Sequence, residues 1–177
     1  MTTTPDAAVT DLQFRAVHQN DPLAAPLLDE LSFEYNSRYG RLVAQEYRDL
    51  RAYPAEEFEP PGGVLIVALS GGVPVAGGAF RQYDSTTAEL KRIWTASAHR
   101  RRGYGRLVVA ELERIAAQRG YARVYLTTGW RQPEAVELYL ASGYTPLYDL
   151  SLRAEDIGRH AFEKQLVGKS PGGELPV

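Results

Sequence analysis

The stretch that decides the fold runs from residue 88 to residue 116 and reads AELKRIWTASAHRRRGYGRLVVAELERIA. Its first part is rich in β-forming side chains and predicts a strand over residues 87–95. Its second part predicts a helix over residues 103–119, because apolar side chains recur at helical spacing along one side. Gly120 suits the end of that helix. The two elements are joined by a short loop of arginines and glycines.

This junction, residues 100–106, predicts an anion site. A helix N-terminus presents backbone amides without partners and the positive end of the helix dipole. Gly103 and Gly105 let the backbone approach an anion closely, and the preceding arginines are donors suited to phosphate. The Rossmann fingerprint is absent because Val108 stands at its third glycine, and the P-loop sequence is absent too. We expect a diphosphate here, with a solvated arginine run as the alternative.

Strand–helix–strand order dominates the second half of the chain. This order predicts an α/β fold, α+β by some schemes, with helices on the faces of one sheet. The other expected elements are strands over residues 12–16 and 122–128, a hairpin within residues 63–83 that turns at Gly71-Gly72, final strands over residues 144–152 and 160–167, and helices from Pro22, over residues 41–51 and from Pro133 to Ser142.

Alternation along the strand of the deciding stretch predicts which side chains share a face. Successive side chains of a strand point to opposite faces. We therefore expect Glu89, Lys91 and Ile93 on one face, with Leu90 and Arg92 on the other.

The length of 177 residues, with 44% hydrophobic and 24% charged residues, fits one globular domain. We expect a single domain over residues 9–167, with flexible ends at residues 1–8 and 168–177. The formal net charge of -2 argues against a surface built as a whole for nucleic acid or anionic membrane.

Several chemistries are excluded by composition. The chain has no cysteine, so disulfides, thiol nucleophiles and thiolate metal sites are ruled out. The three histidines lie far apart in sequence, and we expect no metal site. The first ten residues lack the cationic start and apolar core of a secretory signal, and the aliphatic run 64–69 is about a third of a membrane span. We expect a cytoplasmic protein with no membrane or nucleic-acid partner.

Charge is distributed unevenly along the chain. Residues 91–106 hold six of the 20 basic residues and no acid, whereas residues 29–59 hold eight acids and four arginines. The acidic region would attract a cationic amine. Arg38 and Arg41 in the same region could instead bind a substrate carboxylate.

The motif Arg100-x-x-Gly103-x-Gly105 resembles the central signature of the GNAT superfamily of N-acetyltransferases, Arg/Gln-x-x-Gly-x-Gly/Ala. The preceding ELKRIWTAS is similar to the family's fourth strand, and QPEAVELYLASGY (residues 132–144) is similar to its second signature helix. Residues 62–150 follow the family's order of elements. The resemblance implies a GNAT-like central mixed, mostly antiparallel sheet of about six or seven strands, flanked by helices and splayed between strands four and five.

The resemblance also implies acetyl-CoA as cosubstrate, held in the gap of the splayed sheet. Backbone groups of residues 93–95 would pair with the pantetheine arm, and the amides of residues 101–106 would hold the diphosphate. Gln132 stands where the second signature often has Asn, which leaves its contact with the cofactor open. The implied cofactor-binding residues are Ile93, Trp94, Thr95, Arg100, Arg101, Arg102, Gly103, Tyr104, Gly105, Arg106 and Gln132.

Two residues are candidates for acid–base work. The resemblance implies that Tyr139 faces the thioester sulfur as the acid, and the alternative is an ordinary half-buried helix aromatic. The resemblance likewise points to Glu89 as the base, acting directly or through water, and the alternative is a carboxylate paired with Lys91 or Arg81. Because no cysteine can form an acyl-enzyme, direct attack of the amine in a ternary complex is favoured.

The function implied by the resemblance is acetyl transfer from acetyl-CoA to a primary amine of a small molecule or amino-acid-like acceptor. One alternative is an acetyltransferase acting on protein or peptide amines. A second is a non-catalytic acyl-CoA-binding module, and the presence of Tyr139 and Glu89 argues against it. A third is nucleic-acid binding through residues 100–102. A homodimer is left open.

Overall fold

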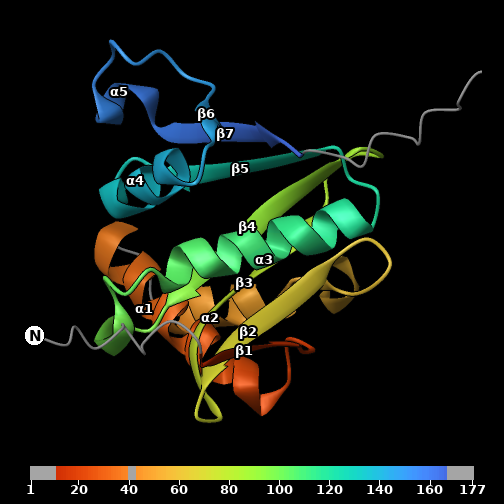
Figure 1. Ribbon diagram of the computed structural model, residues 1–177. Helices are drawn as coiled ribbons and strands as arrows, with labels where there is room; N and C mark the ends of the chain where they lie inside the picture. Colours follow the sequence, from red (N-terminus) through yellow and green to blue (C-terminus); the bar gives the residue numbers. More distant parts are fainter. Residues whose placement is uncertain (1–10, 40–42, 167–177) are drawn as a thin grey trace, which may run out of the picture.

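The computed structural model of the chain describes residues 11–39 and 43–166 (Figure 1). The expected flexible ends, the start of the expected helix at residue 41 and the end of the last expected strand at residue 167 lie outside these ranges. The strands are β1 (Leu12–Ala16), β2 (Val64–Ser70), β3 (Val73–Gln82), β4 (Thr87–Thr95), β5 (Arg123–Gly129), β6 (Thr145–Pro146) and β7 (Arg159–Gln165). The α-helices are α1 (Ala25–Tyr39), α2 (Val43–Ala52), α3 (Tyr104–Gln118), α4 (Pro133–Ala141) and α5 (Ala154–Ile157).

The seven strands form one sheet in the order β1-β2-β3-β4-β5-β7-β6. Every neighbouring pair is antiparallel except β4 and β5, which run parallel. The expected hairpin is present, because β2 and β3 pair directly on either side of Gly71-Gly72. The expected α/β fold, with a mixed and mostly antiparallel sheet flanked by helices, is confirmed.

The sheet splays between β4 and β5. Their ladder holds only Thr87↔Arg123, Ala88↔Val124 and Glu89↔Tyr125, although β4 continues to Thr95 and β5 to Gly129. In Figure 1 the two strands start side by side and diverge toward the end where α1 and α4 lie. The outer half of β4 therefore presents a backbone edge that β5 does not cover.

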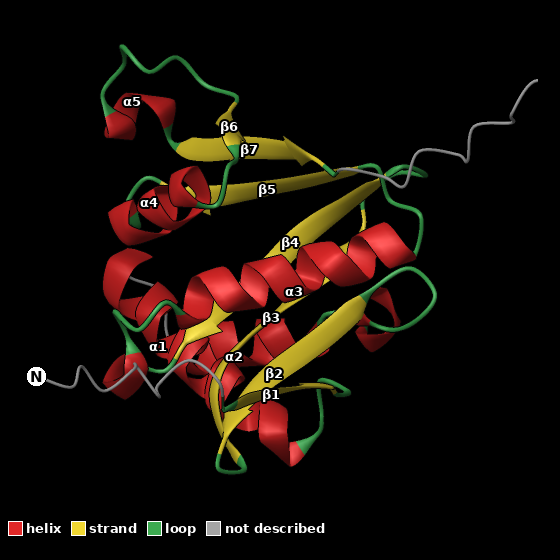
Figure 2. Ribbon diagram, viewed as in Figure 1, coloured by secondary structure: helices red, strands yellow, loops and turns green. Residues whose placement is uncertain are grey.

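Helices cover both faces of the sheet (Figure 2). Side chains of α3 and α4 pack in one buried cluster with Ile66, Phe80 and Leu90, and those of α1 pack in a second with Leu65 and Trp94. Since Leu65 and Ile66 are neighbours in β2, the two clusters lie on opposite faces. No helix within the described ranges is long and apolar enough to cross a membrane.

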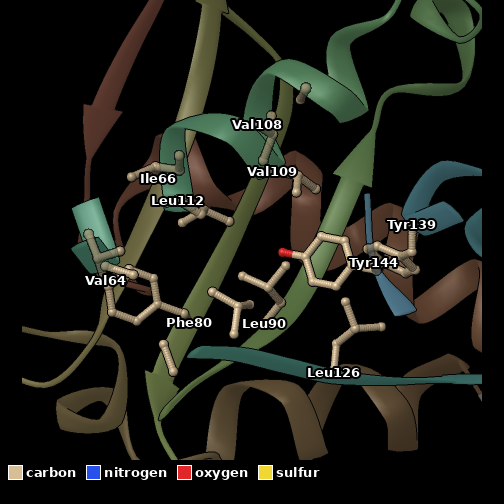
Figure 3. Close-up of a cluster of buried hydrophobic side chains, with 14 of the residues drawn as sticks. Val64, Ile66, Phe80, Leu90, Val108, Val109, Leu112, Leu126, Tyr139 and Tyr144 are labelled. Atoms are coloured by element: carbon tan, nitrogen blue, oxygen red, sulfur yellow. The ribbon is translucent and has the colours of Figure 1, made fainter. Parts of the chain in front are cut away.

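Helix α3 forms because its sequence fits both ends and one face. Gly103 precedes it with a φ of 79°, a left-handed conformation that suits glycine. The side chains of Val108, Leu112 and Ala116 are fully buried on the sheet. Figure 3 shows those of Val108 and Leu112 among the strand side chains of this cluster. The helix expected over residues 103–119 is confirmed.

The expected alternation along β4 is wrong beyond Lys91. Gly77 pairs with Trp94 and Ala79 with Lys91, so two residues of β4 oppose one of β3. The extra residue, Arg92, has a φ of 59° and forms a β-bulge. Ile93 consequently packs with Leu90 against the α3 cluster, while Arg92 turns to the opposite face.

The strand expected over residues 144–152 is also wrong, because only β6 (Thr145–Pro146) forms there. Proline lacks the N–H that would continue a ladder. Farther on, Asp149 accepts hydrogen bonds from the backbone N–H and the hydroxyl of Ser151, at 2.9 and 2.7 Å, and so stabilises a turn. Helix α5 follows, which the sequence analysis did not predict.

Leu112 provides a test of the α3 packing, because its side chain is fully buried. We expect Leu112→Ala to lower the free energy of unfolding by about 3 kcal/mol, since it removes buried contacts and leaves a cavity. Leu152→Ala, at a side chain that is 51% exposed, serves as the matched control and should change it by less than about 0.5 kcal/mol. Equal losses in urea denaturation would contradict this packing.

Candidate active site

A cavity of about 630 Å³ lies where β4 and β5 diverge. The outer halves of both strands form one side of it, through Glu89 to Arg92 and Thr127 to Trp130. Aromatic side chains of α1 and of the segment that follows α2 line much of the rest, so the cavity opens on the α1 and α2 face of the sheet. These are Tyr35, Tyr39, Tyr53 and Phe58.

Glu89 lies in the wall of this cavity and is only 7% exposed. Its Oε1 is 2.9 Å from Nζ of Lys91, and its Oε2 is 3.5 Å from Arg81. Arg81 also donates a hydrogen bond to Glu57 at 3.2 Å. Glu89 therefore both faces the cavity and forms the ion pairs that the sequence offered as its alternative role.

Tyr139 lies on the other face of the sheet, in the α3 and α4 cluster. Its ring packs on those of Tyr144 and Phe162, with centroid distances of 5.7 and 5.8 Å. Burial raises the pKa of Tyr139 well above its usual value, and the nearby phenol of Tyr35 raises it further. Tyr139 is not among the residues that line the 630 Å³ cavity, whereas Tyr35 is. The gap between β4 and β5 thus separates Tyr139 from the face on which Glu89 lies.

The N-terminus of α3 lies next to the end of β4. A Cβ on Gly105 would be 3.3 Å from Leu138 of α4 and 3.7 Å from the hydroxyl of Thr95, so glycine permits close packing here. Arg101 has a φ of 62° and Gly103 one of 79°. Left-handed residues within such a turn direct successive backbone amides toward one side, which is the geometry of an anion-binding nest.

The arginines of this segment are not equivalent. Arg100 pairs with Glu34 of α1 and donates to the carbonyl of Thr95, which directs it away from a free phosphate site. Arg106 donates to the carbonyl of Ala141 at 3.2 Å. Arg101 and Arg102 are exposed and make no ion pair or hydrogen bond to the rest of the described chain. The unengaged donors are therefore these two side chains and the amides at the start of α3.

A second hollow, of about 510 Å³, lies between the start of α3 and the end of α4. Arg102, Arg106 and Lys164 contribute positive charge to its lining. Lys164 is held there by Glu113 at 2.7 Å and by the carbonyl of Ser142 at 2.8 Å. The hollow adjoins the arginine segment on the α3 and α4 face.

The remaining predicted cofactor residues line the gap in different ways. Ile93 and Thr95 lie on the part of β4 that extends past the β5 ladder, while the side chain of Trp94 is buried in the α1 cluster. Gln132 lines the cavity and accepts hydrogen bonds from the hydroxyl of Thr128 at 3.1 Å and the N–H of Gly129 at 3.3 Å. Its carbonyl oxygen is thus used to order the end of β5.

Among the acids of residues 29–59 that the structure describes, Asp49 alone lines the cavity. Glu34 pairs with Arg100, Glu57 with Arg81, and Glu59 with His18 at 3.3 Å. Arg38, one of the two arginines considered for a substrate carboxylate, pairs with Glu134 and donates to the carbonyl of Arg131. The other, at position 41, lies outside the described residues.

Sequence reasoning gave no role to Arg92 and Arg159, which both line the cavity. Arg92 reaches it only because of the bulge in β4, and Arg159 because β7 pairs with β5 through Gly129↔Arg159. Neither placement has a local sequence signal. Both depend on strand pairing between distant segments.

Comparison with known proteins gives one family. The sequence model of the Acetyltransferase (GNAT) family matches residues 25–144. The PaiA N-acetyltransferase of Thermoplasma acidophilum, solved with coenzyme A, is 14% identical over 88% of this chain and 99% of its own, with a TM-score of 0.70.

Two further solved structures share the fold. An acetyltransferase of Thermus thermophilus is 22% identical over 89% of this chain and 99% of its own, with a TM-score of 0.64. The yncA protein of Salmonella typhimurium, solved with its cofactor acetyl-CoA, is 14% identical over 93% and 99%, with a TM-score of 0.61. With the splayed sheet and the glycine-containing start of α3 in place, the chain belongs to the GNAT acetyltransferase family.

Proposed function

We propose that this protein is an N-acetyltransferase that moves an acetyl group from acetyl-CoA directly to a primary amine of a small molecule. The observation that carries the proposal is the gap between β4 and β5. One face of the gap adjoins the start of α3, with its free amides, and the other opens on the cavity that contains Glu89. Two substrates could approach one another through such a gap from opposite faces of the sheet.

The residues present fit a diphosphate-bearing cosubstrate. The amides of residues 101–106 and the free side chains of Arg101 and Arg102 would hold the diphosphate. The open backbone edge of β4 at residues 93–95 would pair with an extended arm as a further strand would. When bound, acetyl-CoA supplies a thioester with an electrophilic acyl carbon. PaiA with coenzyme A and yncA with acetyl-CoA support this choice of cosubstrate.

Glu89 is the proposed base. It takes a proton from the ammonium group of the acceptor before attack, directly or through water, on the cavity face of β4, and the nitrogen loses a second proton as the amide forms. Its ion pairs with Lys91 and Arg81 fix the carboxylate in the wall. The chain has no cysteine for an acyl-enzyme, which favours direct transfer.

Tyr139 is the proposed acid. Its raised pKa keeps the hydroxyl protonated at neutral pH, so the hydroxyl can donate a hydrogen bond to the departing sulfur. Its position on the α3 and α4 face suits this role, because the anion site at the start of α3 lies on the same face. Base and acid then act from opposite sides of the gap.

A small acceptor is favoured over a protein chain. The end of α1 lies across the mouth of the gap, where Arg38 pairs with Glu134 of α4 and the carbonyl of Arg38 accepts from Arg131 at 2.7 Å. The hydroxyl of Tyr39 lies against Gly129. These contacts narrow the approach to a pocket, whereas a peptide would need an open groove.

Cofactor binding is the first test. We expect acetyl-CoA to bind with a micromolar dissociation constant in calorimetry, and Gly105→Val to weaken binding at least about tenfold, because its side chain would displace the start of α3 from Leu138. Ala117→Val, at an exposed position of the same helix, is the matched control. Absence of binding, or tight binding to duplex DNA that acetyl-CoA does not affect, would overturn the proposal.

Tyr139→Phe tests the acid. We expect kcat to fall by about 100-fold or more while the affinity for acetyl-CoA stays nearly unchanged, since only a transition-state interaction is removed. Because the pKa of Tyr139 is raised, its ionisation should not contribute to any loss of wild-type activity up to about pH 10. Equal losses in turnover and cofactor affinity would instead indicate a structural tyrosine.

Glu89→Gln tests the base. We expect kcat/KM to fall by about 100-fold and the pH–rate profile to change, because without this carboxylate the rate depends on amine that is already deprotonated in solution. Glu57→Gln is the control. Glu57 is the other carboxylate that Arg81 contacts and does not line the cavity, so this change should leave activity near that of the wild type. An unchanged pH–rate profile in Glu89→Gln would remove Glu89 as the base.

A further inference from the structure

The wall of the cavity contains a buried cation that the proposed chemistry does not use. Arg92 lines the cavity and is 8% exposed. It occupies the bulge of β4 with a φ of 59°, a conformation that long side chains rarely adopt and that glycine or asparagine adopts more readily. A strained and buried position that nevertheless holds an arginine calls for an explanation from its surroundings.

These surroundings solvate the guanidinium without neutralising it. It donates to the side-chain carbonyl of Gln19 at 3.2 Å and to the carbonyl of Leu50 at 2.5 Å, and lies 4.6 Å above the ring of Phe58. Among the side chains that the structure describes, no carboxylate lies within ion-pair distance of it. Burial lowers the pKa of Arg92 to about 10, so it remains a cation at neutral pH. These two bonds use two of its five N–H groups, and the other three make no hydrogen bond to the part of the chain that the structure describes.

The other charges of the cavity do not balance this cation. Glu89 is already paired with Lys91 and Arg81. Asp49 also lines the cavity and has an interaction of its own. Arg159, at the start of β7, adds a second guanidinium that pairs with no carboxylate of the described side chains. Among the described side chains, Arg92 and Arg159 therefore have no counter-anion in the cavity. They lie in the same lining as Glu89, the carboxylate that we propose takes a proton from the amine.

We propose that Arg92 binds the carboxylate of the acceptor, so that the acceptor is an amino acid or another amine that also carries a carboxylate. This inference rests on the proposed acetyltransferase function and narrows its acceptor. A guanidinium with free N–H groups suits a carboxylate because the two can form parallel hydrogen bonds. Glu89 and Arg92 are three residues apart on one strand, so their Cα atoms are at most about 10 Å apart and one small molecule can reach both side chains.

A purely structural role is the competing explanation. The bonds to Gln19 and Leu50 tie the segment after β1 and helix α2 to β4, and loss of that tie would destabilise the protein whatever the substrate. The two roles differ in what Arg92→Met should do. Methionine keeps an apolar chain against Phe58 and removes a buried cation that has no counter-charge.

The experiment compares amino acids with their decarboxylated amines as matched pairs. The pairs are lysine and cadaverine, arginine and agmatine, histidine and histamine, tyrosine and tyramine, and phenylalanine and phenethylamine. Thiol release gives kcat/KM for each, and calorimetry gives the dissociation constants for the protein with and without bound coenzyme A. We expect at least one amino acid to exceed its amine by about 10- to 100-fold, because only the carboxylate distinguishes the two.

Three variants locate the source of that preference. Arg92→Met should abolish it by raising the KM and dissociation constant of the amino acid about 10- to 100-fold, with those of the amine unchanged. Arg92→Lys should keep part of the preference for the amino acid, because lysine carries the positive charge but lacks the planar guanidinium that forms two parallel hydrogen bonds. Arg123→Met removes a strand arginine that pairs with Glu163 outside the cavity, and should leave the preference intact.

The outcomes separate this inference from the function on which it rests. Equal use of amines and amino acids would overturn the carboxylate site and leave the acetyltransferase proposal standing. Equal losses for both members of a pair in Arg92→Met, with a lower Tm, would assign Arg92 a structural role. If none of the five pairs bound or reacted, the carboxylate site would be overturned too. If acetyl-CoA itself did not bind, the proposed function would fail, and the preference measured without coenzyme A would still decide for or against the carboxylate site.

Discussion

The short parallel ladder between β4 and β5 is the constraint on which the rest of the structure depends. Three residue pairs join the strands, and after Glu89↔Tyr125 they diverge. Parallel strands need a crossover, and α3 supplies it, which brings its N-terminus beside the end of β4. If the ladder continued to Thr95, neither the open edge of β4 nor the cavity would exist. The anion site and the cavity are thus two consequences of one interrupted pairing.

The bulge at Arg92 divides the chemistry between the two faces of the sheet. With strict alternation, Ile93 would share a face with Glu89, and Arg92 would point into the apolar α3 cluster. The extra residue reverses this arrangement: Ile93 joins Leu90 under α3, and the guanidinium of Arg92 enters the wall that contains Glu89. One additional residue therefore keeps charge out of the α3 cluster and adds Arg92 to Glu89 and Lys91 as ionic groups of the cavity from a single strand.

The features that the sequence predicts correctly depend on interactions between residues close together in the chain. The helix over residues 103–119, the hairpin at Gly71-Gly72 and the glycine-containing start of α3 depend on neighbours in the chain, and all three are present. The bulge at Arg92 and the pairing of Arg100 with Glu34 depend on contacts between distant segments, and composition does not reveal them. Tyr139 and Glu89 were identified through a family resemblance; their placement on opposite faces required the sheet topology.

Local charge balance around the cavity differs from what the sequence suggests. Three acids of residues 29–59 form ion pairs, with Arg100, Arg81 and His18, and among the described acids of this region Asp49 alone lines the cavity. One wall contains the paired carboxylate of Glu89 and the guanidinium of Arg92, which has no carboxylate partner among the described side chains. An acceptor with only an amine would leave the guanidinium buried without a counter-charge, which is unfavourable. An acceptor that carries both an ammonium group and a carboxylate could place the first near Glu89 and the second on Arg92. This complementarity favours an amino acid over a simple amine.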